Sequence, residues 1–377
     1  MTSSYADDLA FLRKHTDIVE LSAPGKARVA VAPKYQGRVM TSTLDGESSF
    51  GWLNVKFIAA GTVDERFNNY GGEDRFWLGP EAGQFGLWFA PGEPFDTAHW
   101  KTPAGFDRGG FAITSQGRHS LAMASQFDVS NASGTAFRCA VKRTISALDD
   151  EQAAEHLGVP MPSGMRMVAF ESGNTLVNAG PDAWTRKGGL PSIWILGQFK
   201  PLPRGKVIVP FRPGDEKDLG PRAMTDYFCK LPPERGRLGD DCLLFSCDGQ
   251  FRSKIGISPR RAKRVLGSFD PDAKVLTIVQ FNLPSAAAKL PYVNSLWETQ
   301  KDPFAGDVVN SYNDGEEYPG AGQFGPFYEI ETSSPAAELK AGESITHAHR
   351  TYHFGGPADA LNALSRKVLG VDLGAIR

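Results

Sequence analysis

Short runs of β-branched and aromatic residues recur along almost the whole chain, and turn-forming residues separate them. Examples are residues 111–115, 120–129 and 136–147, and the pattern continues as far as 275–281. Runs of this length between glycine and proline turns are typical of β-strands. The 41 glycines, 26 prolines and 24 phenylalanines suit a chain with many strands and many turns. The pattern predicts an all-β protein.

Helical periodicity is confined to the two ends of the chain and one insertion. Residues 5–15 fit a short helix with Ser4 as its N-cap, residues 149–157 fit a second, and residues 358–368 fit a third with an apolar stripe. No strand–helix–strand alternation occurs, so a parallel, doubly wound sheet is not expected. No linker divides the chain. We therefore expect one domain over residues 1–377, a β-sandwich or barrel with short terminal helices.

Charge and hydropathy disfavour several functions. The formal net charge is −2 and the pI is near 6.4, so nucleic acid is not an expected partner. The sequence contains no run of 18 or more apolar residues, so no membrane span is expected. The first eight residues lack the basic and apolar parts of a signal peptide, which predicts a cytoplasmic protein, or a secreted one if a leader has been removed. Four cysteines without zinc-site spacing predict free thiols.

Two strands joined by a turn are expected just before the last helix. Residues 329–332 read Glu-Ile-Glu-Thr, residues 341–343 read Ala-Gly-Glu, and residues 344–354 form the last strand, with Tyr352 and Phe354 on one face. This order resembles the C-terminal end of the aldose 1-epimerase (galactose mutarotase-like) superfamily. The resemblance implies a galactose mutarotase-like β-supersandwich with a sugar-binding cleft.

Glu331 is the catalytic residue that the resemblance implies, because the matching glutamate of that superfamily is its general base. Mutarotation needs a base to remove the proton of the anomeric hydroxyl and an acid to protonate the ring oxygen. A carboxylate in a partly desolvated cleft suits either role. Strand alternation puts Glu329 on the same face as Glu331. The alternative is that both glutamates face solvent or pair with an arginine.

Three histidines alternate onto one face of the last strand: His347, His349 and His353. Imidazoles at such positions can share one metal ion, and the spacing faintly resembles a cupin metal motif. That motif needs a second histidine-containing segment downstream, and no histidine follows His353, so we expect no metal site. The opposite face carries Tyr352 and Phe354. Because the aromatic face is the one expected to meet the core, the pattern predicts that the three histidines lie on the outer face of the sheet.

Two other histidines are candidates for the catalytic acid. His99 lies in a proline-rich loop, where it could cover a cleft, and His119 opens a strand after a turn. Imidazole can donate a proton near neutral pH, which suits it to this role. The alternative for each is an ordinary loop histidine.

A segment between two glycine turns combines acidic residues, an arginine and a tryptophan, and it resembles a glycine-rich hairpin of sugar-phosphate mutarotase relatives. Carboxylates and guanidinium groups hydrogen-bond to sugar hydroxyls, and tryptophan stacks on the C–H face of a sugar. The alternative is an ion-paired hairpin with a core tryptophan. A later polar segment, residues 310–315, could add polar groups that bind the sugar, or it could form only a turn. The expected substrate-binding residues are Glu73, Asp74, Arg75, Trp77, Glu81, Asn313 and Asp314. Residues 83–89 are expected to follow the hairpin as a buried strand.

These features together predict a carbohydrate-active protein that binds a sugar or glycan, with acid/base catalysis of the aldose 1-epimerase type. A non-catalytic carbohydrate-binding protein is one alternative, because the His-Pro/Val-Tyr and Asn-His contexts of the superfamily's histidines are missing. A glycan lyase or hydrolase is another, because related sandwich folds host such chemistry. No motif implies a cofactor. The identity of the sugar and the oligomeric state stay open.

Overall fold

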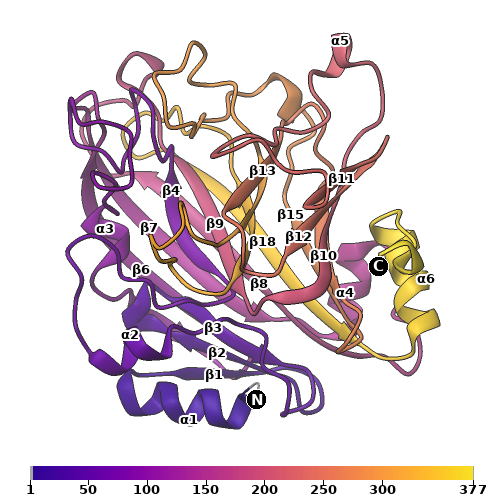
Figure 1. Ribbon diagram of the computed structural model, residues 1–377. Coiled ribbons are helices and arrows are strands. Elements are labelled where there is room, and N and C mark those ends of the chain that lie inside the picture. The colour runs from indigo at the N-terminus through magenta and orange to yellow at the C-terminus, as the bar shows by residue number, and fades with distance from the viewer. Residues whose placement is uncertain (1–2, 377) are drawn as a thin grey trace.

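Three antiparallel β-sheets make up the protein, as the computed structural model shows for the residues that it describes, 3–376 (Figure 1). The largest sheet has the strand order β11 (Gly236–Leu238), β12 (Cys242–Cys247), β10 (Leu202–Pro210), β14 (Val265–Asp270), β15 (Val275–Phe281), β18 (Ser344–Gly355), β8 (Arg166–Asn178), β7 (Ala136–Ala147), β6 (Ser120–Ser130) and β5 (Ala112–Gln116). The second sheet has the order β13 (Ser253–Ile257), β16 (Val309–Asn313), β17 (Tyr328–Ser333), β9 (Ser192–Phe199) and β4 (Arg75–Gly79). The third consists of β1 (Val19–Ser22), β2 (Arg28–Ala32) and β3 (Arg38–Thr43).

Helices are few and lie at the margins of the sheets (Figure 1). Their bounds are α1 (Tyr5–His15), α2 (Val55–Ala60), α3 (Ala104–Asp107), α4 (Asp150–Leu157), α5 (Glu216–Leu219) and α6 (Ala358–Val368). The predicted all-β class and the two predicted terminal helices are confirmed. No helix within residues 3–376 has the length and apolar character that crossing a membrane requires.

The expected strand at residues 83–89 is wrong. The chain there folds back on itself: the amide of Leu87 donates to the carbonyl of Pro80, and the amide of Trp88 donates to the carbonyl of Glu81. A side chain on Gly86 would approach the Cα of Ala82 to 2.6 Å, so this turn requires glycine. Leu87, Trp88 and Phe89 of this run are buried within a compact loop rather than in a strand.

The five-stranded sheet packs face to face on the ten-stranded sheet, and β17 shows which of its side chains point inward. Thr332 of β17 contacts Nε2 of His347 at 2.7 Å and Nδ1 of His349 at 2.8 Å, both on β18 of the larger sheet. Tyr328 likewise reaches Ser268 of β14 at 2.8 Å. The even-numbered residues of β17 therefore face the larger sheet, and Glu329 and Glu331 face away from it.

The predicted outward orientation of the histidines on β18 is wrong. His347, His349 and His353 are at most 1% exposed and point into the layer between the sheets. Tyr352 and Phe354, on the opposite face, are also buried, because α6 and α4 cover that face with a second apolar cluster. Both faces of this strand are thus interior, and its aromatic face does not mark the side of the main core.

Stability should decrease below pH 6.5 because two of these histidines are buried as neutral groups. Burial lowers the pKa of His347 to about 3 and that of His349 to about 4, from 6.5. Below pH 6.5 the unfolded chain gains protons that the folded chain does not, so the unfolded state is favoured as pH falls. Between pH 7 and pH 5 we expect a loss of about 2 kcal/mol for each histidine. Urea unfolding at both pH values measures this loss, and a His347→Gln/His349→Gln variant should show less of it. An equal loss in both proteins would contradict the assignment.

Candidate functional site

The outward face of the five-stranded sheet brings together side chains from all five strands. Strand register aligns Lys254, Tyr312, Glu329 and Gln198 in one row across β13, β16, β17 and β9. In the next row, Glu331 and Arg75 lie on either side of Leu196 of β9, from β17 and β4. Charged residues far apart in the sequence thereby meet on one surface.

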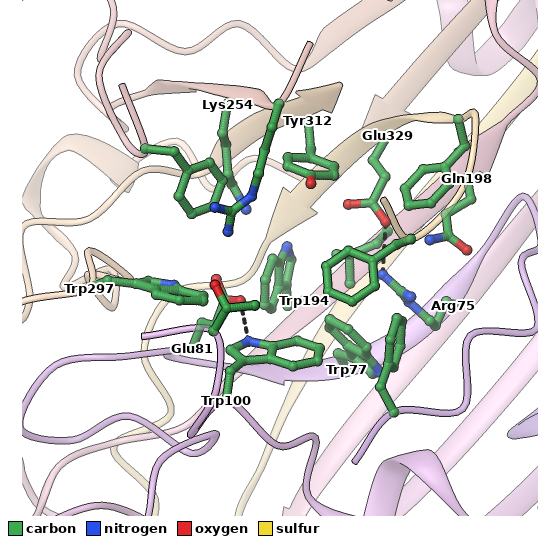
Figure 2. Close-up of a pocket in the computed structure, with 17 residues that line it drawn as sticks. Arg75, Trp77, Glu81, Trp100, Trp194, Gln198, Lys254, Trp297, Tyr312 and Glu329 are labelled. Atoms are coloured by element: carbon green, nitrogen blue, oxygen red, sulfur yellow. Dashed lines mark hydrogen bonds and ion pairs between the residues drawn. The ribbon is translucent and has the colours of Figure 1, made fainter. Parts of the chain in front are cut away.

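A pocket lies over this face, and loops with aromatic side chains wall it (Figure 2). Its volume is about 60 Å³. The residues that line it are Phe67, Arg75, Trp77, Glu81, Thr97, Trp100, Trp194, Leu196, Gln198, Phe228, Arg252, Lys254, Trp297, Tyr312, Phe324, Phe327 and Glu329. Four of the chain's seven tryptophans are among them. Large aromatic walls around a few charged groups are the usual composition of a small-molecule site.

Arg75 donates a hydrogen bond to Glu329 in the pocket (Figure 2). Nη2 of Arg75 lies 3.0 Å from Oε1 of Glu329, and both side chains are almost completely buried. The guanidinium group also lies over the ring of Trp77, 3.7 Å from its centroid. Nε and Nη1 of Arg75 have no hydrogen-bond partner. Gln198 lies beside Glu329 on the neighbouring strand β9, and its Oε1 also has no hydrogen-bond partner. This end of the pocket therefore offers both donors and an acceptor to a polar ligand.

Glu331 lies beneath the pocket surface and is not among the residues that line it. Its Oε2 accepts a hydrogen bond from Nε1 of Trp194 at 3.0 Å and lies 3.0 Å from Nζ of Lys254. The carboxylates of Glu331, Glu81 and Glu329 hold the pKa of Lys254 above its usual value despite burial. Lys254 therefore presents a positive charge to the pocket, and Glu331 positions it.

Two carboxyl groups do face the pocket, and they enter from different sides (Figure 2). Glu329 lies beside Arg75, whereas Glu81 lies beside Trp100 and Trp297. Burial, together with the neighbouring Glu331 carboxylate, raises the pKa of Glu329 to about 8 and outweighs the opposing effect of Arg75. Burial also raises the pKa of Glu81, while the indole N–H of Trp100 donates to its Oε1 at 2.8 Å and favours its ionised form.

The other expected substrate-binding residues lie outside this pocket. Glu73 accepts hydrogen bonds from the hydroxyl of Ser42 and contacts Nε2 of His353 at 2.8 Å. Asp74 points to the inter-sheet layer, where it pairs with Arg143. Arg75, Trp77 and Glu81, by contrast, all line the pocket.

The side chains of the later polar segment, residues 310–315, stabilise the loops beside it. The Oδ1 atom of Asn313 accepts from the amide of Gly249 at 2.9 Å. Asp314 accepts from the hydroxyl of Tyr312 at 2.6 Å and from the amide of Gly325 at 2.8 Å. These bonds are made within the protein, and neither residue lines the pocket.

His99 and His119 also lie outside the pocket lining. His99 sits on the surface, with Nδ1 2.6 Å from Asp96 and Nε2 3.2 Å from Glu93. His119 is exposed, and its Nδ1 lies 2.7 Å from the carbonyl oxygen of Ser22. Within residues 3–376, no group of three or more His, Cys, Asp or Glu side chains is arranged to hold a metal ion.

Sequence reasoning missed several residues of the pocket, above all Lys254, Trp100, Trp194 and Trp297. Lys254 is the one charged residue of β13, which reads Ser-Lys-Ile-Gly-Ile, and a lysine within a strand is a local signal for a functional position. The tryptophans carry no local signal, because their positions depend on loops that converge only in the folded chain. Strand alternation predicts that Glu329 shares a face with Glu331, but it does not predict that Glu329 is the residue that lines the pocket.

Comparison with known proteins gives a family and a fold. The model of the family of unknown function DUF6786 matches residues 3–377. No curated protein matches the chain in sequence. An Escherichia coli K12 structure, whose assignment as an aldose 1-epimerase is provisional, superposes with a TM-score of 0.53 at 12% identity and covers 90% of this chain and 99% of that one. The Slr1438 protein of Synechocystis sp. PCC 6803 gives 0.51 at 13% identity, with 91% and 96% covered.

These likenesses confirm the predicted fold, and at such identities they show the fold alone. The family match spans almost the entire chain. The chain therefore belongs to the family of unknown function DUF6786, and its fold is that of the aldose 1-epimerase and galactose mutarotase-like structures.

Proposed function

We propose that the pocket binds a sugar and that Glu329 and Glu81 transfer protons at its anomeric centre, in a reaction of the aldose 1-epimerase type. One observation carries this proposal: two carboxyl groups with raised pKa values, in different surroundings, enter the same aromatic pocket. Pairs of titratable groups in contrasting environments are characteristic of acid/base sites. The fold that the chain shares with a provisionally assigned aldose 1-epimerase agrees with this proposal.

The pocket walls suit a sugar ring. The indole rings of Trp77, Trp100 and Trp297 provide flat apolar surfaces for its C–H faces. The free nitrogens of Arg75 can donate to ring hydroxyls, and the free oxygen of Gln198 can accept from them. A ligand with alternating apolar and hydroxyl faces would satisfy both kinds of surface.

The proposed reaction uses one proton donor and one acceptor. Glu329, protonated near neutral pH because of its raised pKa, gives its proton to the ring oxygen as the bond between that oxygen and the anomeric carbon breaks. Glu81, whose ionised form Trp100 stabilises, takes the proton of the anomeric hydroxyl, and an open-chain aldehyde results. Rotation about the bond next to the aldehyde and ring closure with both proton transfers reversed give the other anomer. No cofactor is needed for this balance.

Glu331 keeps a role in the proposal as a positioning residue. It holds Lys254, whose charge favours the ionised form of Glu81. The role of general base, which the sequence resemblance implied for Glu331, is thus assigned instead to Glu81.

Polarimetry with a panel of freshly dissolved reducing aldoses and aldose phosphates tests this function. The proposal expects the protein to accelerate the approach to rotational equilibrium for at least one of them. Saturable binding without acceleration would support a non-catalytic binding protein instead. Absence of both binding and acceleration across the panel would remove the sugar proposal.

The pH dependence of turnover should be bell-shaped. Glu81 must be ionised and Glu329 protonated, so turnover should fall at low pH as Glu81 gains a proton. It should also fall above about pH 8 as Glu329 loses its proton. Initial rates from pH 5 to pH 10 measure both limbs. A rate that keeps rising through pH 9 would contradict the assignment of Glu329 as the acid.

A further inference from the structure

A second cavity of about 230 Å³ adjoins the pocket, and its lining includes Arg66, Asp314, Glu317 and Gln323. We call the pocket described above the inner pocket and this second cavity the outer compartment. The inner pocket and this outer compartment share four lining residues: Thr97, Arg252, Tyr312 and Phe324. These shared side chains form the partition between the two spaces.

The inner pocket is too small for the ligand that its walls suit. Its 60 Å³ equals the space of only a few water molecules. Pockets that hold small ligands usually measure roughly 300–1,000 Å³. The two compartments together approach that size, so a sugar ring requires the partition to move.

The movable part of the partition is the exposed segment 316–324, which we call the gate segment. Glu317 joins it to the opposite loop by accepting a hydrogen bond from the hydroxyl of Thr97 at 2.6 Å. Glu317 also lies 3.3 Å from Nη1 of Arg252. Phe324 closes the inner pocket, with its ring edge-on to Phe67 at a centroid distance of 5.6 Å.

The base of the gate segment is held, whereas its tip is free. The Asp314 carboxylate accepts from the amide of Gly325, and this bond pins the two ends of the segment together. Gly320 and Gly322 have φ angles of +85° and +74°, and no atom lies within 4 Å of the position of a Cβ on either residue. The tip around these two glycines can therefore move without losing packing, which is the property of a hinged loop. At the C-terminal end of the segment, opening separates Phe324 from Phe67 and Trp100 and breaks the hydrogen bond from Nδ2 of Asn69 to the Phe324 carbonyl.

We propose that the gate segment opens by release of Glu317 from Thr97 and Arg252, and that the inner and outer compartments then form one two-part binding site. The inner part takes the ring of the sugar, and the polar outer part takes a hydroxylated or charged substituent on it. The nature of the ligand rests on the proposed function, whereas the gate itself does not.

Quenching of tryptophan fluorescence by acrylamide tests the gate without any sugar. Acrylamide is small and neutral, and it reaches Trp77, Trp100 and Trp194, which are at most 5% exposed, only when the gate is open. The half-buried Trp297 contributes the same background in every variant. We expect Glu317→Ala and Phe324→Ala each to raise the quenching rate constant about twofold to fivefold, the shift that the loss of one weak surface latch produces. Tyr318→Ala is the matched control, because Tyr318 is 65% exposed on the same segment and lines neither compartment.

Equal quenching in wild type, Glu317→Ala and Tyr318→Ala would overturn the gate. So would wild-type quenching as fast as that of a free indole, because the pocket would then already be open. Far-ultraviolet circular dichroism and melting curves verify that each variant is folded. If Glu317→Ala increases quenching but no sugar of the polarimetry panel reacts or binds, the gate stands and the proposed function fails.

Discussion

We expect Glu329→Gln to lower the turnover of sugar mutarotation by about 10²–10⁴-fold, the usual contribution of a positioned proton-transfer group. Glutamine has nearly the same size, and its carbonyl oxygen can still accept from Arg75, so sugar binding should survive. What it cannot do is give a proton to the ring oxygen. The loss should therefore fall on kcat, with KM changed little, and the alkaline limb of the pH profile should disappear.

Glu331→Gln is the matched comparison, because it removes the neighbouring carboxylate of the same strand. Glu331 contacts Lys254 and Trp194 rather than the pocket. We expect a smaller loss of turnover from it, through a displaced Lys254, together with a retained alkaline limb. An inactive Glu331→Gln beside a fully active Glu329→Gln would reverse the assignment and favour the base that the sequence alone implied.

The largest effect on stability should come from the buried pair of Asp74 and Arg143. Both side chains are completely buried. Arg143 lies on β7 and donates from Nε to the carbonyl of Gly37 at 3.0 Å, while Asp74 accepts from the hydroxyl of Ser172 on β8 at 2.7 Å. The pair thereby joins the start of β4, the ten-stranded sheet and the turn between β2 and β3.

Asp74→Leu should lower the free energy of unfolding by about 3–5 kcal/mol, because Arg143 would remain charged and unpaired in the interior. Urea denaturation followed by circular dichroism measures this loss. The double variant Asp74→Leu/Arg143→Met should recover much of it, since no unpaired charge remains. A single variant as stable as wild type would show that water reaches Arg143, contrary to its burial. A double variant no more stable than the single one would mean that lost packing, rather than charge, causes the effect.

The elements that the sequence predicts well are those with strong local signals. The helix at residues 5–15 begins at Ser4, whose side chain accepts from the amide of Asp7 in a capping box. The last helix buries Leu361 and Leu364, which belong to its predicted apolar stripe. The residues that make up each of these signals lie within a few positions of one another, so each helix can be predicted without knowledge of the rest of the fold.

The orientation of the last strand could not be read in the same way. β18 lies between two interior layers, one formed by the five-stranded sheet and one by α4 and α6. Strand alternation distinguishes an interior face from an exposed one, but both faces here are interior. The polar contacts that His349 and His353 make come from Thr332, Thr277 and Glu73, on other strands and loops.

The candidate site was predicted only in part for a related reason. Arg75, Trp77 and Glu81 come from one continuous segment, and the sequence identified that segment as a possible sugar platform. Trp100 and Lys254 reach the same pocket from loops and strands that are distant in sequence. Glu329 and Glu331 share one face of β17, but Lys254 and Trp194 contact the Glu331 carboxylate and keep it beneath the pocket surface. These contacts between distant residues appear only in the folded structure.

A crystal structure of Glu329→Gln soaked with the aldose panel would show whether the pocket holds a sugar between the two glutamates. We expect a sugar ring in the inner pocket, stacked on tryptophan, with its anomeric hydroxyl within hydrogen-bond distance of Glu81 and its ring oxygen facing residue 329. We also expect the gate segment to be displaced from its closed position. A sugar bound elsewhere on the protein, or an inner pocket that stays without sugar at saturating concentrations, would contradict the proposed site.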